Sequence, residues 1–180
     1  MYTYGYKWQQ ALKKILKRLA LNEGDGFLVL EGPDGSGKTD LINLVRQIIS
    51  KPTTIQDVLN PEILHLAESV HSHRYFLVDI GSENVSFHIT SIPTTILENI
   101  CYQISMNGAP ESCRLLILWD DIDKSIKIGD EQANRYFLEE IHRPLKMYEQ
   151  LTFLCSMTSV RGNAKEILGI SAGIGHFIKL

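Results

Sequence analysis

The sequence is poor in the features that mark several large classes of protein. It has three cysteines, Cys101, Cys113 and Cys155, an odd number without a Cys-x-x-Cys pair. Disulfide frameworks and zinc sites use paired cysteines, so these are predicted to be reduced and mostly buried thiols. No apolar run approaches the length of a membrane span, and the first residues lack the layout of a signal peptide. These absences predict a cytoplasmic protein without a membrane partner.

An excess of one charge is also missing. Lysine and arginine number 18 and aspartate and glutamate 21, which gives a net charge of −3. Nucleic acid is therefore not indicated as a partner, because binding it would need a local basic patch. The hydrophobic fraction of 44% and the charged fraction of 22% are ordinary for a globular protein. The 180 residues predict one domain, 1–180, that buries about 70% of the surface of the unfolded chain.

The most informative stretch runs from Glu31 to Thr39 and reads Glu-Gly-Pro-Asp-Gly-Ser-Gly-Lys-Thr. It fits the phosphate-binding pattern of Gly, four residues, then Gly-Lys-Ser/Thr. A short apolar run, 27–30, precedes it, and the following residues, 40–49, have apolar positions at helical spacing. This strand, loop and helix predict a nucleotide-binding site formed by Gly32, Pro33, Asp34, Gly35, Ser36, Gly37, Lys38, Thr39 and Asp40.

The residue types of this loop explain what it would bind. Glycines let the backbone N–H groups turn inward at the positive end of the following helix, which makes an anion site. Lys38 would reach the β- and γ-phosphates, and the Thr39 hydroxyl would ligate Mg²⁺. We therefore predict that the chain binds ATP or another nucleoside triphosphate together with Mg²⁺. The alternative is a glycine-rich turn that binds nothing.

Three aspartates follow the most apolar stretch of the chain, 115–119. An apolar strand ending in carboxylates is typical of the second half of a phosphate-transfer site. We assign Asp120 to the metal and either Asp121 or Asp123 to activation of the attacking water. Side chains alternate along a strand, so the choice of base stays open. The alternative is that these carboxylates only begin a loop.

A further apolar stretch, 151–157, is predicted to deliver Ser156, Thr158, Ser159 and Arg161 to the same edge. A polar side chain there would sense the γ-phosphate, and Arg161 would neutralise phosphate charge; an ordinary surface loop is the alternative. The predicted catalytic residues are Lys38, Asp120, Asp121, Asp123 and Arg161, and the predicted metal ligands are Thr39 and Asp120.

The remaining periodicities predict the fold. An N-terminal amphipathic helix, with Trp8 on its apolar face, occupies 1–22 and leads into a nucleotide-binding core, 23–180. Its basic face (Lys13, Lys14, Lys17 and Arg18) is predicted to be solvated, with a contact to phosphate or an acidic partner as the alternative. Further strands are predicted at 74–80 and 176–180, and helices at 62–70, 94–106 and 130–150. Asn60 is predicted to cap the first of these helices, with Pro61 at its first position. Alternating strands and helices predict a three-layer α/β P-loop NTPase fold with about five mostly parallel strands and helices on both faces.

The loop alone resembles that of thymidylate kinases. This resemblance implies, as an alternative function, transfer of the γ-phosphate to a nucleoside monophosphate. That family also carries an Asp-Arg-aromatic motif and an arginine-rich lid. Here His73-Arg74-Tyr75 matches the motif poorly, and no arginine-rich segment is visible.

The order of elements along nearly the whole chain resembles the NACHT and related STAND ATPases, which are signalling relatives of the AAA+ proteins. Asp120-Asp121-Ile122-Asp123 and Thr158-Ser159-Val160-Arg161 approximate two of their motifs. The resemblance implies an ATP-binding, slowly hydrolysing domain that acts as a nucleotide-dependent switch or oligomerisation module. It also implies a homo-oligomer or neighbouring domains as partners. Those proteins carry a helical lid beyond the last strand, whereas this chain ends at Leu180, so weak nucleotide affinity is expected.

Overall fold

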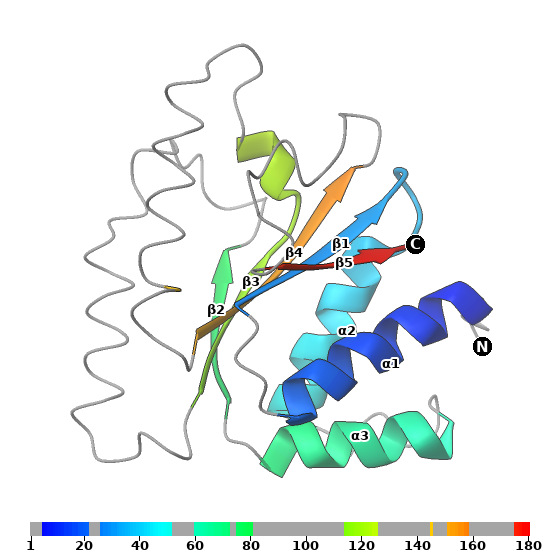
Figure 1. Cartoon of the computed structure of the whole chain (residues 1–180), viewed down its shortest axis with the longest axis vertical. Helices are drawn as coiled ribbons and strands as arrows, with labels where there is room; N and C mark the ends of the chain where they lie inside the picture. Colours follow the sequence, from blue (N-terminus) through cyan, green and yellow to red (C-terminus); the bar gives the residue numbers. More distant parts are fainter. Residues whose placement is uncertain are drawn as a thin grey trace.

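The computed structural model describes residues 5–21, 26–51, 60–72, 75–80, 114–125, 145, 151–158 and 175–180 (Figure 1). In chain order, its elements are α1 (Tyr6–Leu21), β1 (Phe27–Gly32), α2 (Lys38–Ser50), α3 (Pro61–Ser72), β2 (Tyr75–Ile80), β3 (Arg114–Trp119), the 3₁₀-helix η3 (Ile122–Ser125), β4 (Leu151–Thr158) and β5 (Gly175–Lys179). The predicted helix at 94–106 and nearly all of that at 130–150 lie outside the described residues.

The strands form one five-stranded sheet in the order β2-β3-β4-β1-β5. Every neighbouring pair is parallel. The predicted α/β class with a parallel sheet is therefore confirmed. Because the strands are parallel, the carboxyl ends of β1, β3 and β4 lie at the same edge of the sheet (Figure 1).

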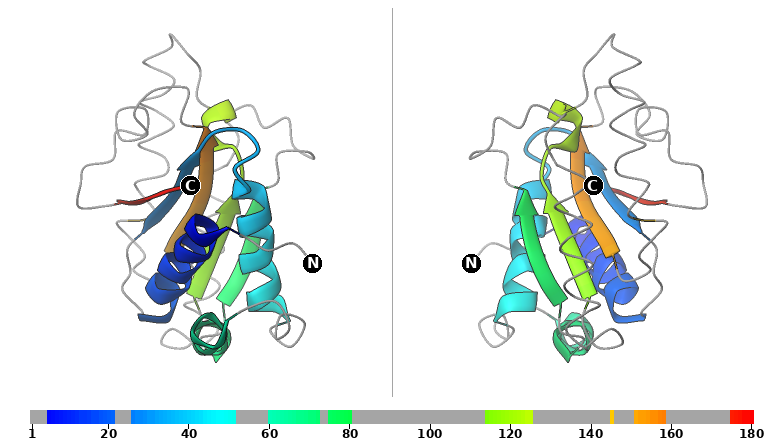
Figure 2. Two further views of the ribbon diagram at one scale, coloured as in Figure 1. Left: turned by 90° about the vertical axis from the view of Figure 1, so that its right-hand side faces the viewer. Right: turned by 90° about the vertical axis from the view of Figure 1, so that its left-hand side faces the viewer.

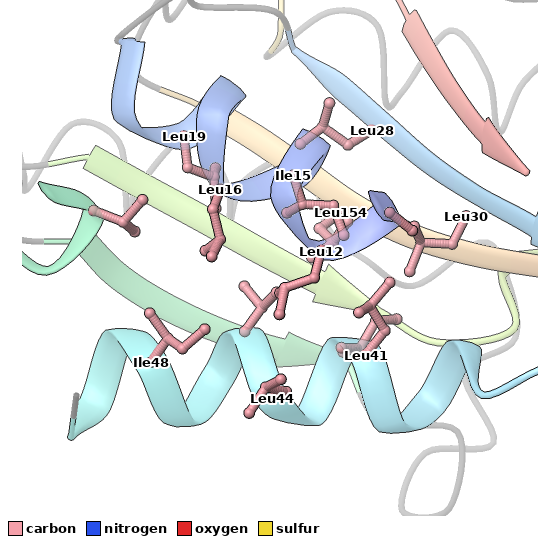
Figure 3. Packing of buried hydrophobic residues seen from close by; sticks show 14 of the residues in the cluster. Leu12, Ile15, Leu16, Leu19, Leu28, Leu30, Leu41, Leu44, Ile48 and Leu154 are labelled. Atoms are coloured by element: carbon pink, nitrogen blue, oxygen red, sulfur yellow. The ribbon is translucent and has the colours of Figure 1, made fainter. Parts of the chain in front are cut away.

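Helices α1 and α2 cover one face of the sheet side by side (Figure 2). Their apolar side chains meet alternate residues of the strands, because successive side chains of a strand point to opposite faces. The core shown in Figure 3 includes Leu12, Ile15, Leu16, Leu19, Leu28, Leu30, Leu41, Leu44, Ile48 and Leu154. The apolar face predicted for the N-terminal helix is thus confirmed as the buried one.

The intervening strand residues point to the opposite face and are also buried, for example Val29 and Ile117. On that face the rings of Phe27 and Phe153 stack with their centroids 5.3 Å apart. Burial on both faces is usual for a parallel sheet and explains why its strands are apolar throughout. The helices predicted for this second face lie outside the described residues.

Two local predictions are confirmed around the sheet. Asn60 caps α3, since its Oδ1 atom accepts a hydrogen bond from the N–H of Ile63 at 2.9 Å, and Pro61 occupies the first helical position. Cys155 is buried and forms no disulfide, and burial raises the pKa of its thiol well above the ordinary value. Among the described residues, no helix is long and apolar enough to cross a membrane.

A tyrosine joins the edge strand β2 to α1. The Tyr75 hydroxyl donates a hydrogen bond to the carbonyl oxygen of Leu19 at 2.7 Å. Burial raises the pKa of Tyr75 to about 12, although the neighbouring Arg114 partly lowers it. Because the folded-state pKa is raised, the neutral phenol stabilises the fold fully below about pH 10, and this contribution is lost as the pH rises towards 12.

We expect Tyr75→Phe to lower the free energy of unfolding at pH 8 by about 1 kcal/mol, because the hydrogen bond to Leu19 is lost. Urea denaturation of both proteins between pH 8 and 12 measures this difference. Above pH 10 the phenol ionises in the unfolded parent but stays neutral in the folded one, which lowers the parent's stability, so the difference should shrink. A difference that stays constant over this range would contradict the interpretation.

Candidate phosphate and metal site

The predicted phosphate-binding loop connects the carboxyl end of β1 to the first residue of α2. Gly35 has φ +75° and Gly37 has φ +85°, a left-handed conformation that glycine adopts without strain. The Ser36 N–H donates to the Pro33 carbonyl at 3.2 Å, and the Leu41 N–H donates to the Gly37 carbonyl at 3.0 Å. The loop is therefore a tight turn that ends at the N-terminus of a 13-residue helix.

Lys38, the first residue of α2, turns back into the loop. Its side chain is only 6% exposed, and its ammonium donates hydrogen bonds to the carbonyls of Gly32 at 2.9 Å and Pro33 at 2.8 Å. Within the described residues, no carboxylate forms an ion pair with it. A buried cation held only by neutral carbonyls is costly, so an anion beside it would be strongly favoured.

Ser36 is a second polar group aimed into the loop. Its Oγ atom is buried and has no hydrogen-bond partner among the described residues. A methyl group built on Gly32 would lie 2.7 Å from this oxygen, so the loop leaves room only for glycine there. An unsatisfied buried hydroxyl is uncommon in native proteins and is consistent with a site for a polar ligand.

The two predicted metal ligands come from separate elements and meet at the loop. The Thr39 hydroxyl donates a hydrogen bond to Oδ2 of Asp120 at 2.7 Å. Ser156 fixes this carboxylate from the other side, since its hydroxyl donates to Oδ1 of Asp120 and accepts from the N–H of Asp121 at 2.8 Å. Asp120 is thus held between the loop and β4.

The spacing of these oxygens fits Mg²⁺. Two neighbouring ligands of an octahedral Mg²⁺ lie about 2.9 Å apart, because each is 2.0–2.1 Å from the ion. The Thr39 and Asp120 oxygens are 2.7 Å apart, so only a small shift separates this geometry from a pair of metal ligands. Hydroxyl and carboxylate oxygens are also the donor types that Mg²⁺ prefers. The residues present therefore fit the ion.

The other two aspartates occupy different surroundings. Strand β3 ends at Trp119, and Asp121 has a positive φ of 53°, so the alternation of side chains along the strand does not continue through the cluster. Asp123 is the second residue of η3 and is only 4% exposed. The catalytic roles assigned to these residues stay predictions. Arg161 and Ser159 lie outside the described residues.

Two further contacts close the loop. The Thr158 hydroxyl at the end of β4 donates to Oδ1 of Asp34 at 3.1 Å. The indole N–H of Trp8, in α1, donates to the Gly37 carbonyl at 3.2 Å. The helical spacing of apolar residues predicts the buried position of Trp8 but does not indicate its contact with the loop. Only the general need of a buried indole N–H for an acceptor could have hinted at it.

Comparisons with known proteins give two informative structural matches. A structure of PCH-2 from C. elegans superposes with a TM-score of 0.55 at 16% identity over 97% of this chain. A structure of the E. coli MS115-1 HORMA:CdnC:Trip13 complex superposes with a TM-score of 0.53 at 11% identity over 95% of this chain. This chain spans 42% and 62% of those two chains. At these identities the matches show a shared fold alone.

No protein-family model and no curated protein matches the sequence. The resemblance to STAND and NACHT ATPases was therefore wrong as a family assignment, because the matching structures are PCH-2 and a HORMA:CdnC:Trip13 complex. The function inferred from that family, an ATP-hydrolysing switch or oligomerisation module, is corrected for the same reason, and so is the kinase alternative. The loop residues and metal ligands were predicted from local chemistry rather than from the family, so they stay predictions.

The contact between Trp8 and Gly37 generates a prediction about stability. At both Gly37 and Gly35 a side chain would be strained, because the backbone has a left-handed φ. At Gly37 a methyl group would in addition lie 3.2 Å from two atoms of the Trp8 indole, whereas at Gly35 it would contact nothing. We expect Gly35→Ala to cost about 1–2 kcal/mol of unfolding free energy and Gly37→Ala to cost more. Urea denaturation measures both values.

The Trp8→Ala background provides the control. There the extra cost of Gly37→Ala over Gly35→Ala should disappear, because the indole it collides with is gone. If the excess persists without the indole, Trp8 does not pack on the loop as described.

Proposed function

We propose that this chain is a binding module for a nucleoside triphosphate with Mg²⁺, built on a three-layer P-loop fold. The observation that carries the proposal is the buried Lys38 ammonium at the N-terminus of α2, which donates to two carbonyls and forms no ion pair with a described carboxylate. Positive charge, left-handed backbone at Gly35 and Gly37 and a helix N-terminus together favour the binding of an anion. A terminal phosphate is the anion that suits this combination.

Each residue of the site has a distinct part in this proposal. The backbone N–H groups of 35–39 would hold the phosphate oxygens, and the Lys38 ammonium would exchange a carbonyl for one of them. Thr39 and Asp120 would hold Mg²⁺, which neutralises phosphate charge. Ser156 would keep the Asp120 carboxylate in place through the hydrogen bond described above. The proposal concerns binding and assigns no reaction.

The chain would work beside neighbouring domains or partner proteins. It spans less than two thirds of each matched chain, and one of those chains belongs to a complex of HORMA, CdnC and Trip13. A fold of this kind thus occurs in a multiprotein assembly, and this supports a partner protein for the present chain.

We expect Lys38→Ala to weaken binding of Mg²⁺-ATP at least tenfold, because it removes the only described cation in the loop; a tenfold loss corresponds to about 1.4 kcal/mol. The two tryptophans of the chain, Trp8 and Trp119, both lie next to the site, so their fluorescence should change on binding. Lys51→Ala is the matched control, because it removes an exposed lysine that directly follows the last residue of α2, at the end of the helix far from the loop.

Metal dependence separates the phosphate site from the metal site. Asp120→Asn should reduce the gain in affinity that Mg²⁺ gives and leave metal-free binding nearly unchanged, because only the metal ligand is altered. Titrations with ATP, GTP and inorganic tripolyphosphate, each with and without Mg²⁺, measure this gain and the contribution of the nucleoside. If Lys38→Ala binds Mg²⁺-ATP as tightly as the parent, the loop is not the phosphate-binding site. If tripolyphosphate binds as tightly as ATP, the proposal that the ligand is a nucleoside triphosphate would be wrong.

A further inference from the structure

A groove between α1 and β5 carries a local positive charge that the phosphate site does not use. Its volume is about 420 Å³, and its lining includes Lys14, Lys17, Arg18 and Leu21 of α1 and His176 and Phe177 of β5. Along the axis of α1, these four helix residues lie about 9–20 Å beyond Trp8, which contacts the loop. We call this surface the α1–β5 groove.

The cations of the α1–β5 groove are arranged as a single stripe. Lys14, Lys17 and Arg18 are related by three and four positions, and Leu21 follows at the seventh, so all four share one helical face. Lys14 and Lys17 are exposed, and among the described residues that line the groove there is no carboxylate. Like charges at this spacing slightly destabilise a helix, so the stripe is not explained by the stability of α1.

The exposed Lys14 and Lys17 agree with the solvated basic face predicted from the sequence. Three of the four cations of that face, Lys14, Lys17 and Arg18, also border a concave surface that contains apolar groups. Leu21 is 51% exposed, one of only two large apolar side chains in the described part of the chain that are strongly exposed. Phe177 is half-buried at the opposite wall. A ligand that fits the groove must therefore offer both negative charge and an apolar side chain.

We propose that the α1–β5 groove binds an acidic peptide segment of a partner protein, with carboxylates on the Lys14, Lys17 and Arg18 stripe and an apolar side chain against Leu21 and Phe177. Charge complementarity favours this occupant over nucleic acid. Nucleic-acid binding relies on many phosphate contacts along an extended basic surface, whereas this chain has a net charge of −3 and a short stripe. Leu21 would also find no apolar partner on a phosphate backbone.

Fluorescence anisotropy with short fluorescein-labelled peptides tests the proposal. The probe alternates glutamate with leucine, and the two comparison peptides replace either all glutamates by glutamine or all leucines by serine. We expect the probe to bind, and each comparison peptide to bind at least fivefold more weakly, because each lacks one half of the required chemistry. Affinity of the probe should fall steeply with added salt, since exposed charges are screened.

Variants of the protein locate the binding surface. Lys17→Glu with Arg18→Glu should weaken probe binding at least tenfold, and Leu21→Ser severalfold. Lys7→Glu is the matched control, because Lys7 is an exposed lysine of α1 that does not line the groove, and it should change affinity less than twofold. Circular dichroism and unchanged urea midpoints verify folding, and unchanged Mg²⁺-ATP binding shows that the phosphate site is separate.

Three results would overturn the proposal. No probe binding at about 1 mM peptide would remove the acidic segment as a ligand. Equal loss of affinity in Lys7→Glu would show attraction to charge in general rather than to this groove. Tighter binding of a single-stranded DNA oligonucleotide than of the probe, abolished by the Lys17 and Arg18 reversals, would make the groove a nucleic-acid site instead. Because ATP binding is measured separately, failure here leaves the proposed nucleotide site untouched.

Discussion

A lysine ammonium buried at the start of a helix has to be surrounded by oxygen atoms, and in this chain the carbonyls of Gly32 and Pro33 supply them. The loop must curl back over its own first residues for this to happen. That curvature requires left-handed backbone at Gly35 and Gly37 and leaves no space for a side chain at Gly32. The shape of the loop and the position of its charge are therefore set by the same contacts.

The loop does not stand alone, because the sheet order brings two other strand ends to it. Strand β4 lies between β3 and β1 in the sheet. Its register places Thr158 beside Gly32, and Cys155 beside Trp119, the residue before Asp120. Ser156 and Thr158 can thus bond Asp120 on one side and Asp34 on the other. The position of β4 joins the two halves of the site.

The sequence predicted the local parts of this arrangement well. Apolar runs located all five strands to within a residue or two at either end, and the Asn60-Pro61 pair marked the start of α3. Parallel strands also placed the loop, Asp120 and the end of β4 at one edge. Strand order and register could not be read in this way, because they depend on which apolar faces pack together over long separations. The hydrogen bond from Trp8 to Gly37, 29 residues away, belongs to the same category.

The family assignment failed for a related reason. A glycine-rich loop followed by Lys38 and Thr39, and an apolar strand that ends at Asp120, specify a chemistry of phosphate and metal. Such chemistry can be grafted on one fold for many purposes, so it does not separate one family from another. Many families also have the same order of helices and strands, so this order does not identify a family either. The motifs therefore support the ligand proposed for the site, whereas the wider resemblance carried no information about the whole protein.

Helix α1 contacts both the phosphate-binding loop and the α1–β5 groove. One face of it is buried in the same core as β1, α2 and β4, so residues 6–21 are part of the folded core rather than an appendage before it. Its first turn touches the phosphate loop through Trp8, and its last two turns form one wall of the α1–β5 groove. Because a packed helix moves as a unit, the two surfaces keep a fixed spacing. Helix α1 would therefore relate the proposed nucleotide site at its first turn to the proposed peptide groove at its last two turns.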